Sequence, residues 1–492
     1  MESGGIVESI GNKTILVTGA TGFVAKLFVE KVLRVQPNVK KLYLLLRAPD
    51  TKSATQRLHN EVIEKEVFRV LRQKHGAGFD SFISEKVTPV PGDISCENLG
   101  VEDCDLRDEM WREIDIVVNM AATVNFDERY DDALYTNTLG VKHVLNFAKK
   151  CAKLQMFVHV STAYVAGQQE GVIMEKPYRM GETLNGTPGL DIEQELKVAE
   201  ERSKEVQDLG FTKKQERIAM KELGLTRARL YGWPNTYTFT KAMGEMLIGN
   251  LRENMPVVII RPTMITSTYY EPFPGWIEGL RTIDSLALGY GKGKLTFFLG
   301  NPKMIIDLIP GDMVVNSIIV AMVAHLNQPC EHIYHVGSSV SQPLQVTFVQ
   351  EIGYHYFAMN PCMDKDENPI KVGKVAIFSN MDDFRRYMLI RYLIPLKGLQ
   401  LLNVVCCQYF EGAYGDLKRK ISFVLRLLEL YEPYLFFKGV FDDLNTEMLR
   451  KATLKNEVEA SMFCFDPKHI NWANYFMNTH LPGLVKYVFR SQ

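Results

Sequence analysis

A short apolar strand that runs directly into a glycine turn and a helix is the feature that most restricts how this chain can fold. Residues 13–18 are β-branched and apolar, which is typical of a buried parallel strand. Gly19 and Gly22 follow at once, and a helical pattern covers 26–35. This order is the context of a dinucleotide-binding loop, in which Gly19 allows the tight turn and Gly22 lets backbone N–H groups approach a pyrophosphate. The alternative is a glycine-rich turn of another α/β fold.

This loop defines the first expected cofactor contacts. The third glycine of the usual dinucleotide fingerprint is replaced by Ala25, at a position where the helix packs on the sheet. The residues of the loop that we expect to contact the cofactor are Thr18, Gly19, Thr21, Gly22, Phe23 and Val24.

The second strand, residues 42–46, ends in a basic residue, Arg47. An Asp or Glu at this point would bind a free ribose 2′-hydroxyl, whereas an arginine suits a 2′-phosphate. We therefore expect NADPH as the cofactor, with Lys52 as a second basic group. The alternative is an exposed arginine at the end of a strand.

Three more strand ends are expected to line the same crevice, because ligands of a doubly wound sheet bind outside the carboxyl ends of its strands. The strand at 86–94 ends in an acid that would accept a hydrogen bond from the adenine amine, unless it only caps a loop. The strand at 114–122 ends in small residues, which let a cofactor lie close to the backbone. The expected contacts from these ends, and from the end of the strand at 256–260, are Asp93, Ile94, Ala121, Ala122, Pro262 and Thr263.

The fifth strand, residues 156–160, is followed by two hydroxyl residues, Ser161 and Thr162. Hydroxyls at this end of the strand face the crevice and can hold a carbonyl oxygen. The alternation of strands and helices predicts an α/β fold, a doubly wound parallel Rossmann sheet with flanking helices. The alternation continues to a helix at 313–326, for which Asp312 is the expected N-cap.

A tyrosine and a lysine four residues apart, Tyr237 and Lys241, lie in a predicted helix that begins after Asn235, its expected N-cap. The spacing places both side chains on one face, one turn apart. A nearby ammonium favours the phenolate, so the tyrosine can give up and retake a proton near neutral pH. The alternative is an exposed amphipathic helix.

The strand–helix alternation is interrupted at residues 170–232 and fades from about residue 345, and these two changes set the expected domain organisation. Residues 170–232 are charge-rich and predict an insertion of two solvated helices, 191–209 and 212–223. The insertion is either a lid over a long substrate or an inert surface elaboration. We expect a nucleotide-binding domain over 12–345 and a mainly helical domain over 375–492.

Two segments of the helical domain, 384–410 and 418–437, combine basic residues with large apolar faces. Such helices can lie on a membrane surface. The alternative is that they pack on each other or on the first domain.

Composition excludes several classes of function. The net charge of −1 gives no reason to expect nucleic-acid binding, and the eight cysteines form no C-x-x-C pair, so we expect neither a metal site nor a disulfide framework. We see no signal peptide and no uncharged apolar run long enough to span a bilayer.

Three motifs follow one another along the chain: the glycine turn at 19–22, the hydroxyl pair at 161–162 and the tyrosine–lysine pair at 237–241. Their order resembles that of the extended short-chain dehydrogenase/reductase family over roughly residues 12–340. Longer runs closely resemble the plant alcohol-forming fatty acyl-CoA reductases, a family that often carries alanine at position 25. These runs are residues 12–19, 36–47, 158–164, 232–242, 260–267 and 271–279. Residues 434–443 and 465–472 look like the C-terminal male-sterility domain of that family.

The resemblance implies a four-electron reduction of long-chain acyl-CoA to a primary fatty alcohol and CoA, using two NADPH, as in wax and other lipid biosynthesis. It implies that Thr162, or Ser161, binds the carbonyl oxygen, that Tyr237 donates a proton to it, and that Lys241 lowers the tyrosine's pKa and holds the nicotinamide ribose. It also implies peripheral attachment to the cytosolic face of the endoplasmic reticulum. An enzyme that stops at the aldehyde, or a non-catalytic NADP-binding scaffold, remains an alternative. The oligomeric state stays open.

Overall fold

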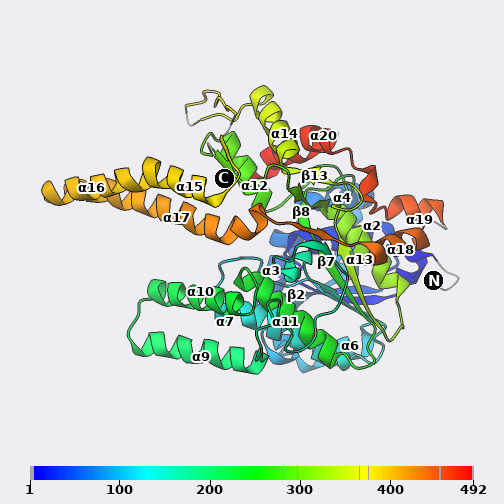
Figure 1. Ribbon diagram of the computed structural model, residues 1–492. Coiled ribbons are helices and arrows are strands. Elements are labelled where there is room, and N and C mark those ends of the chain that lie inside the picture. The colour runs from blue at the N-terminus through cyan, green and yellow to red at the C-terminus, as the bar shows by residue number, and fades with distance from the viewer. Residues whose placement is uncertain are drawn as a thin grey trace. The chain divides into compact units, whose positions relative to one another are not determined.

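The computed structural model describes residues 5–489, apart from 281, 296, 365, 375, 454 and 455 (Figure 1). The chain forms two compact units. Unit 1 contains residues 1–280, 307–343 and 440–492, and unit 2 contains residues 281–306 and 344–439. The predicted helical domain, 375–492, is therefore divided between the two units, because its last part folds with the sheet.

Unit 1 is built on a parallel sheet of seven strands in the order β12-β7-β5-β4-β1-β2-β3. Strand order reverses between β1 and β4, which is the switch point where a ligand crevice opens in a doubly wound sheet. The prediction of a doubly wound parallel sheet is confirmed. The strands are β1 (Thr14–Thr18), β2 (Lys41–Leu46), β3 (Val87–Pro91), β4 (Ile116–Asn119), β5 (Met156–Val160), β7 (Val257–Pro262) and β12 (Glu331–Val336).

The central strands are buried on both faces, as continuous apolar runs predict. On one face, Leu16, Val117 and Phe157 share a core with α8 (Gly140–Lys149). Helix α8 packs on α11 (Thr236–Leu251), and α13 (Gly311–Ala324) packs on α2 (Phe23–Val35). The other helices of unit 1 are α1 (Ile6–Ile10), α3 (Thr51–Arg57), α4 (Arg69–His75), α5 (Phe79–Lys86), α6 (Cys104–Glu113), α7 (Tyr130–Ala133), α9 (Ile192–Asp208), α10 (Lys213–Leu230), α18 (Leu444–Thr453), α19 (Glu457–Met462), α20 (Trp472–Tyr475) and α21 (Leu481–Leu484).

The insertion forms a helical hairpin, α9 and α10, which run side by side in Figure 1. The turn between them contains Gly210 at φ +70°, a conformation that favours glycine. Helix α10 extends seven residues beyond the predicted end at 223, because its last turns pack into the same apolar cluster as Phe239 and Met243 of α11. The hairpin is therefore continuous at its base with the core around α11.

The prediction for Asp312 is wrong. Pro310 precedes α13 as its N-cap, and Asp312 lies inside the first turn. Its buried carboxylate accepts the backbone N–H groups of Tyr269 and Tyr270 at 2.8 Å and of Glu271 at 3.0 Å. The residue therefore orders the 269–271 loop.

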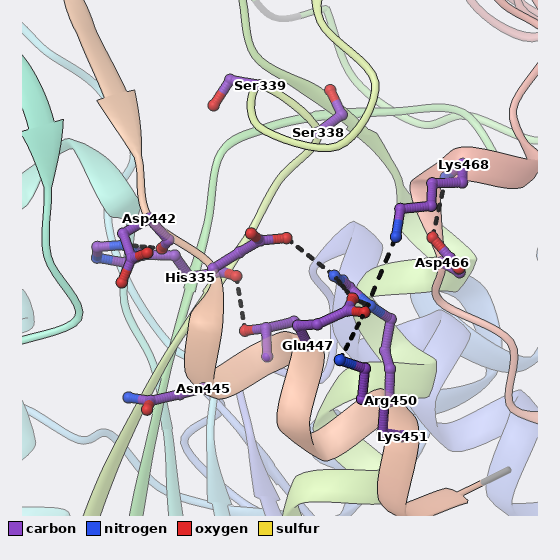
Figure 2. Close-up of polar contacts among 12 residues, drawn as sticks. His335, Ser338, Ser339, Asp442, Asn445, Glu447, Arg450, Lys451, Asp466 and Lys468 are labelled. Atoms are coloured by element: carbon purple, nitrogen blue, oxygen red, sulfur yellow. Dashed lines mark hydrogen bonds and ion pairs between the residues drawn. The ribbon is translucent and has the colours of Figure 1, made fainter.

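The last segment of the chain completes unit 1 through polar contacts with the edge strand (Figure 2). The ring Nδ1 of His335 lies 2.9 Å from the Asp442 carbonyl oxygen, and the hydroxyl of Thr446 donates to the His335 carbonyl at 2.8 Å. Within the segment itself, the guanidinium of Arg450 binds Asp443 at 2.9 Å and Glu447 at 2.5 Å.

Further along this segment, the buried Tyr475 hydroxyl donates to the Ser267 carbonyl at 2.7 Å. The same hydroxyl lies 2.8 Å from the Thr266 hydroxyl, beside the end of β8 (Met264–Thr266). β8 pairs in parallel with β11 (Leu308–Pro310).

Unit 2 is mainly helical. A small apolar cluster holds Leu299, Phe384 and Met388 together. The elements are α12 (Thr282–Gly291), β9 (Phe297–Leu299), β10 (Ile305–Ile306), β13 (Leu344–Gln345), α14 (Val346–Met359), β14 (Ala376–Phe378), α15 (Met381–Met388), α16 (Ile394–Val405) and α17 (Glu411–Leu435).

Helix α15 continues through a π-helical turn into α16, and α16 and α17 pack side by side as a hairpin in Figure 1. The helix over Met381–Val405 is long and apolar enough to cross a membrane by length and composition alone, and only 11% of its most apolar window is buried. This helix includes charged residues, so it differs from the uncharged apolar run by which a membrane span is expected from sequence.

Candidate active site

The two hydroxyl residues after β5 have different surroundings. The Thr162 hydroxyl caps the short turn at Ala163–Ala166 by accepting the N–H of Tyr164 at 3.3 Å, and it lies 3.5 Å from the Pro262 carbonyl. The Ser161 hydroxyl is buried and has no hydrogen-bond partner within the described part of the chain. Because a buried polar group normally finds a partner, Ser161 is suited to bind a ligand oxygen.

Helix α11 is fixed against this strand end at its first turn. The Asn235 side chain accepts the N–H of Thr238 at 3.0 Å, which is the predicted N-cap. The indole of Trp233 donates to the Val165 carbonyl at 2.8 Å, in the turn that follows Thr162. The start of α11 and the hydroxyl pair are thereby held together.

Tyr237 and Lys241 lie one turn apart on α11. The Tyr237 side chain is partly buried, and its ring stacks on Phe126 with centroids 5.7 Å apart. Lys241 is 1% exposed, and its Nζ donates to the Val160 carbonyl at 2.8 Å, directly before Ser161. The structure therefore brings the lysine to the strand end that carries the hydroxyl pair.

Burial controls the charge of Lys241. Loss of water around the ammonium lowers its pKa from 10.5 to about 8, against the opposing attraction of Glu245 one turn further on. This lysine therefore titrates within reach of physiological pH, unlike an exposed lysine.

Three polar residues at the ends of neighbouring strands were not predicted as a group. The sheet register pairs Thr18 with Asn119 and Asn119 with His159, so they form a row across β1, β4 and β5. We refer to Thr18, Asn119 and His159 as the polar row. The Nε2 of His159 lies 3.3 Å from the Lys241 Nζ. Burial and the nearby lysine hold the pKa of His159 well below its usual value, so this imidazole is neutral.

The glycine turn after β1 has the shape that a dinucleotide requires. Gly19 has φ +70°, and a Cβ at this position would lie 2.7 Å from the backbone of Ala121. Gly22 is the N-cap of α2, whose described first turn carries no acidic side chain and no side-chain cap. A helix start without an acidic side chain fits the negative charge of a pyrophosphate.

Other predicted contacts of the loop differ in exposure. Thr21 and Val24 are partly exposed. The Phe23 ring is buried and stacks on Trp276 with centroids 5.0 Å apart, so its side chain serves packing. Ala25 is buried where the helix meets the sheet.

Arg47 and Asp93 meet at the ends of β2 and β3. The Arg47 Nε lies 2.9 Å from an Asp93 oxygen, and the arginine side chain is 69% exposed. Asp93 also accepts the N–H of Ser95 at 2.9 Å, so it caps the loop as well. The side chain of Ile94 is buried in the apolar core.

The end of β7 is buried and firmly held. The Thr263 hydroxyl donates to Asp307 at 2.9 Å, and Pro262 is the last residue of β7. Strand β4 ends at Asn119, so Ala122 lies in the loop three residues beyond the strand and not in it as predicted from sequence. Arg261 forms a buried ion pair with Glu245 of α11, with a shortest distance of 2.5 Å. Among the described residues, no group of three or more His, Cys, Asp or Glu is arranged to hold a metal ion.

A seven-stranded parallel sheet, a phosphate-binding turn after β1, and a tyrosine–lysine pair beside two strand-end hydroxyls define a nicotinamide-dependent reductase of the Rossmann type. Solved structures agree on the fold. The terminal reductase domain of the myxalamid biosynthetic pathway covers 97% of this chain and 92% of its own, with a TM-score of 0.57 at 18% identity. A reductase domain of a nonribosomal peptide synthetase from Mycobacterium tuberculosis gives the same TM-score at 17% identity, and the match covers 99% of this chain and 96% of that one.

Sequence comparison identifies the family. Two models described as male sterility protein match residues 17–318 and 391–491. The chain is 57% identical to the alcohol-forming fatty acyl-CoA reductase of Simmondsia chinensis over 99% of both chains. It is 54% identical to fatty acyl-CoA reductase 1 of Arabidopsis thaliana, over 98% of this chain and 99% of that one. The chain belongs to the fatty acyl-CoA reductase family, and the expected resemblance is confirmed.

Proposed function

We propose that the protein reduces long-chain acyl-CoA to a primary fatty alcohol, releasing CoA and consuming two NADPH. The observation that carries this proposal is the unpartnered Ser161 hydroxyl beside Thr162, at the strand end that Lys241 binds. The near-complete likeness to relatives named fatty acyl-CoA reductases supports the substrate class.

NADPH is the proposed cofactor, and the chain offers residues suited to it. The glycine turn and the start of α2 would hold the pyrophosphate, and Ala121 and Ala122 would let the dinucleotide lie on the backbone. Arg47, largely exposed at the end of β2, would bind the 2′-phosphate. When bound, the nicotinamide supplies hydride to a carbonyl carbon.

The polar side chains of the site would stabilise the carbonyl oxygen of the substrate as it becomes negatively charged. The hydroxyls of Thr162 and Ser161 would donate hydrogen bonds to the carbonyl oxygen of the thioester. Tyr237 would give its proton to that oxygen as charge develops, and Lys241 would restore the tyrosine's proton. Collapse of the thiohemiacetal breaks the carbon–sulfur bond and expels CoA thiolate. The same groups would then act on the aldehyde, which completes a four-electron reduction.

The test is NADPH oxidation by purified protein supplied with C16, C18 and longer acyl-CoAs, with products identified by gas chromatography. Primary alcohol at two NADPH per molecule is the expected result. Aldehyde at one NADPH would replace the proposal with the two-electron reaction. Tight NADPH binding without turnover of any acyl-CoA would overturn it in favour of a non-catalytic scaffold.

We also propose peripheral membrane attachment, with the cytosolic face of the endoplasmic reticulum as the location. The support lies in the hairpin of unit 2, where apolar side chains point into solvent at the end of α16. Leu401 is 69% exposed and Val405 is 78% exposed. Exposed cations on α16 and α17, including Lys397 and Lys418, would face anionic headgroups.

Flotation with vesicles of phosphatidylcholine and a minority of phosphatidylserine tests this attachment. The double variant Leu401→Asp and Val405→Asp is expected to stay at the bottom of the gradient while the parent chain floats. Leu209→Asp, at the tip of the other helical hairpin, is the matched control and is expected to float. Flotation of the double variant with its parent would contradict the proposal.

A further inference from the structure

The direction of the hydrogen bonds in the polar row follows from counting donors. The Thr18 hydroxyl oxygen accepts the backbone N–H groups of Met120 and Ala121, both at 3.2 Å. Its own hydrogen is therefore left for the Asn119 side-chain oxygen, 2.6 Å away. That distance is ordinary for a hydroxyl donor.

The next contact fixes the histidine. Since its oxygen accepts from Thr18, Asn119 presents its NH₂ group to the Nδ1 of His159, at 3.2 Å. Nδ1 must then carry a lone pair. A neutral imidazole has one N–H, so the hydrogen of His159 sits on Nε2.

The hydrogen on Nε2 points at Lys241, whose Nζ is 3.3 Å away. An ammonium has no lone pair and cannot accept this hydrogen, whereas a neutral amine can. The Val160 carbonyl accepts from the lysine in either state. The row therefore favours the amine over the ammonium.

We propose that His159 is a positioning residue, which Thr18 and Asn119 orient so that its Nε2–H stabilises the neutral amine of Lys241 and promotes proton release from that lysine. This inference rests on the proposed function, in which Tyr237 gives its proton to the substrate oxygen. The resulting phenolate takes a proton from the Lys241 ammonium, and the amine left behind accepts the His159 hydrogen bond until water protonates it again.

Other ionisable groups around Lys241 act in known directions. Glu245, one turn further along α11, favours the ammonium, and the pairing of Glu245 with Arg261 of β7 limits that effect. Tyr237 lies one turn before the lysine on the same helix. These groups stay in place in the row variants below, and His159→Phe adds no charge, so a change in the titration of Lys241 that both row variants share reports the polar row.

Two variants test the inference. Asn119→Asp replaces the NH₂ donor by a carboxylate oxygen, which moves the histidine hydrogen to Nδ1 and leaves Nε2 able to accept from the ammonium. His159→Phe removes the N–H altogether. His480→Phe, at a buried histidine outside the row whose Nδ1 lies 3.1 Å from the Ser267 hydroxyl, is the matched control.

The primary readout needs neither cofactor nor substrate. The protein is labelled with ¹³C at the lysine Cε, and the signal lost in Lys241→Arg is followed from pH 6 to about pH 11 by NMR. Both row variants are expected to raise the titration midpoint of Lys241 by one pH unit or more, while the control leaves it in place. The alkaline limit of kcat is expected to move the same way.

The outcomes separate this inference from the proposed function. An unchanged midpoint in Asn119→Asp and His159→Phe, or an equal change in His480→Phe, overturns the role of the row even if the protein reduces acyl-CoA. A raised midpoint in a protein that reduces no acyl-CoA supports the row and overturns the proposed reaction. If His159→Phe does not fold, Asn119→Leu provides the result: it removes the NH₂ donor without adding a charge, so nothing holds the hydrogen of His159 on Nε2, and the midpoint is expected to rise.

Discussion

The buried ion pair between Glu245 and Arg261 offers a stringent test of how α11 is held on the sheet. The side chains are 1% and 2% exposed, and the Arg261 Nε and Nη2 atoms both bind the carboxylate. The guanidinium also lies 5.2 Å from the centre of the Tyr178 ring. Each charge is thus compensated chiefly by the other.

Removing one partner leaves an uncompensated charge in the core. Breaking such a pair costs about 3–5 kcal/mol, whereas replacing both partners by apolar residues of similar volume is often neutral. We therefore expect Glu245→Leu and Arg261→Met each to lower the free energy of unfolding by about 3–5 kcal/mol. The double variant should lose less than about 2 kcal/mol, because no charge is left unpaired.

Urea unfolding followed by circular dichroism measures these differences. With an m value of about 3 kcal/mol per M, each single variant should lower the midpoint by roughly 1–1.7 M, and the double variant by well under 1 M. The reasoning is refuted if the single variants lose less than about 1 kcal/mol, or if the double variant loses the sum of the two.

Four further outcomes are expected. Tyr237→Phe should lower kcat by about 10²–10⁴-fold while NADPH binding, followed by fluorescence, stays intact; a fully active variant would end the proposed mechanism. Arg47→Glu should weaken NADPH binding by tenfold or more and leave NADH binding little changed, and retained NADPH affinity would remove Arg47 from the site. Lys241→Met should be more stable than the parent at pH 7 by about 3 kcal/mol, since burial lowers the pKa of Lys241 from 10.5 to about 8. Between pH 8 and pH 10.5 the lysine is protonated in the unfolded chain but not in the folded one, so the free energy of unfolding of the parent rises with pH. The stability advantage of Lys241→Met should therefore vanish above about pH 10.5, and urea midpoints measured from pH 7 to that value would show it. Tyr475→Phe should cost about 0.5–1.5 kcal/mol in the same unfolding assay, because the buried Ser267 carbonyl loses its shorter hydrogen bond and is left with the longer one from the Gly311 N–H at 3.4 Å; an unchanged midpoint would contradict this.

Most of the fold could be predicted because it depends on local patterns. Buried β-branched runs predict the strands of the sheet, and the spacing of Tyr237 and Lys241 predicts one face of α11 whatever surrounds it. The N-cap at Asn235 follows from residue type and position alone.

The remainder depends on contacts between distant parts of the chain. Asp312 has the residue type of an N-cap, yet its three backbone donors come from a loop more than 40 residues away. The position of Ile94 at a strand end predicted a ligand contact, but the side chain points into the core. The signal for the polar row in the sequence was a single polar residue near the end of each apolar strand, such as His159. The contact between His159 and Lys241 could not be predicted, because it depends on the register of the sheet.

The order in which unit 1 is assembled has a consequence for synthesis on the ribosome. Its edge strand β12 begins at Glu331, and the segment from 440 onward supplies Tyr475 to the loop after β8. A nascent chain that has emerged only as far as residue 439 already contains all seven strands but exposes the surface that this segment covers. Such an intermediate presents apolar and polar groups of unit 1 to solvent until the segment from 440 onward has emerged. The protein is therefore expected to depend on chaperones that shield nascent chains, and a stop codon before residue 440 should yield an aggregation-prone product.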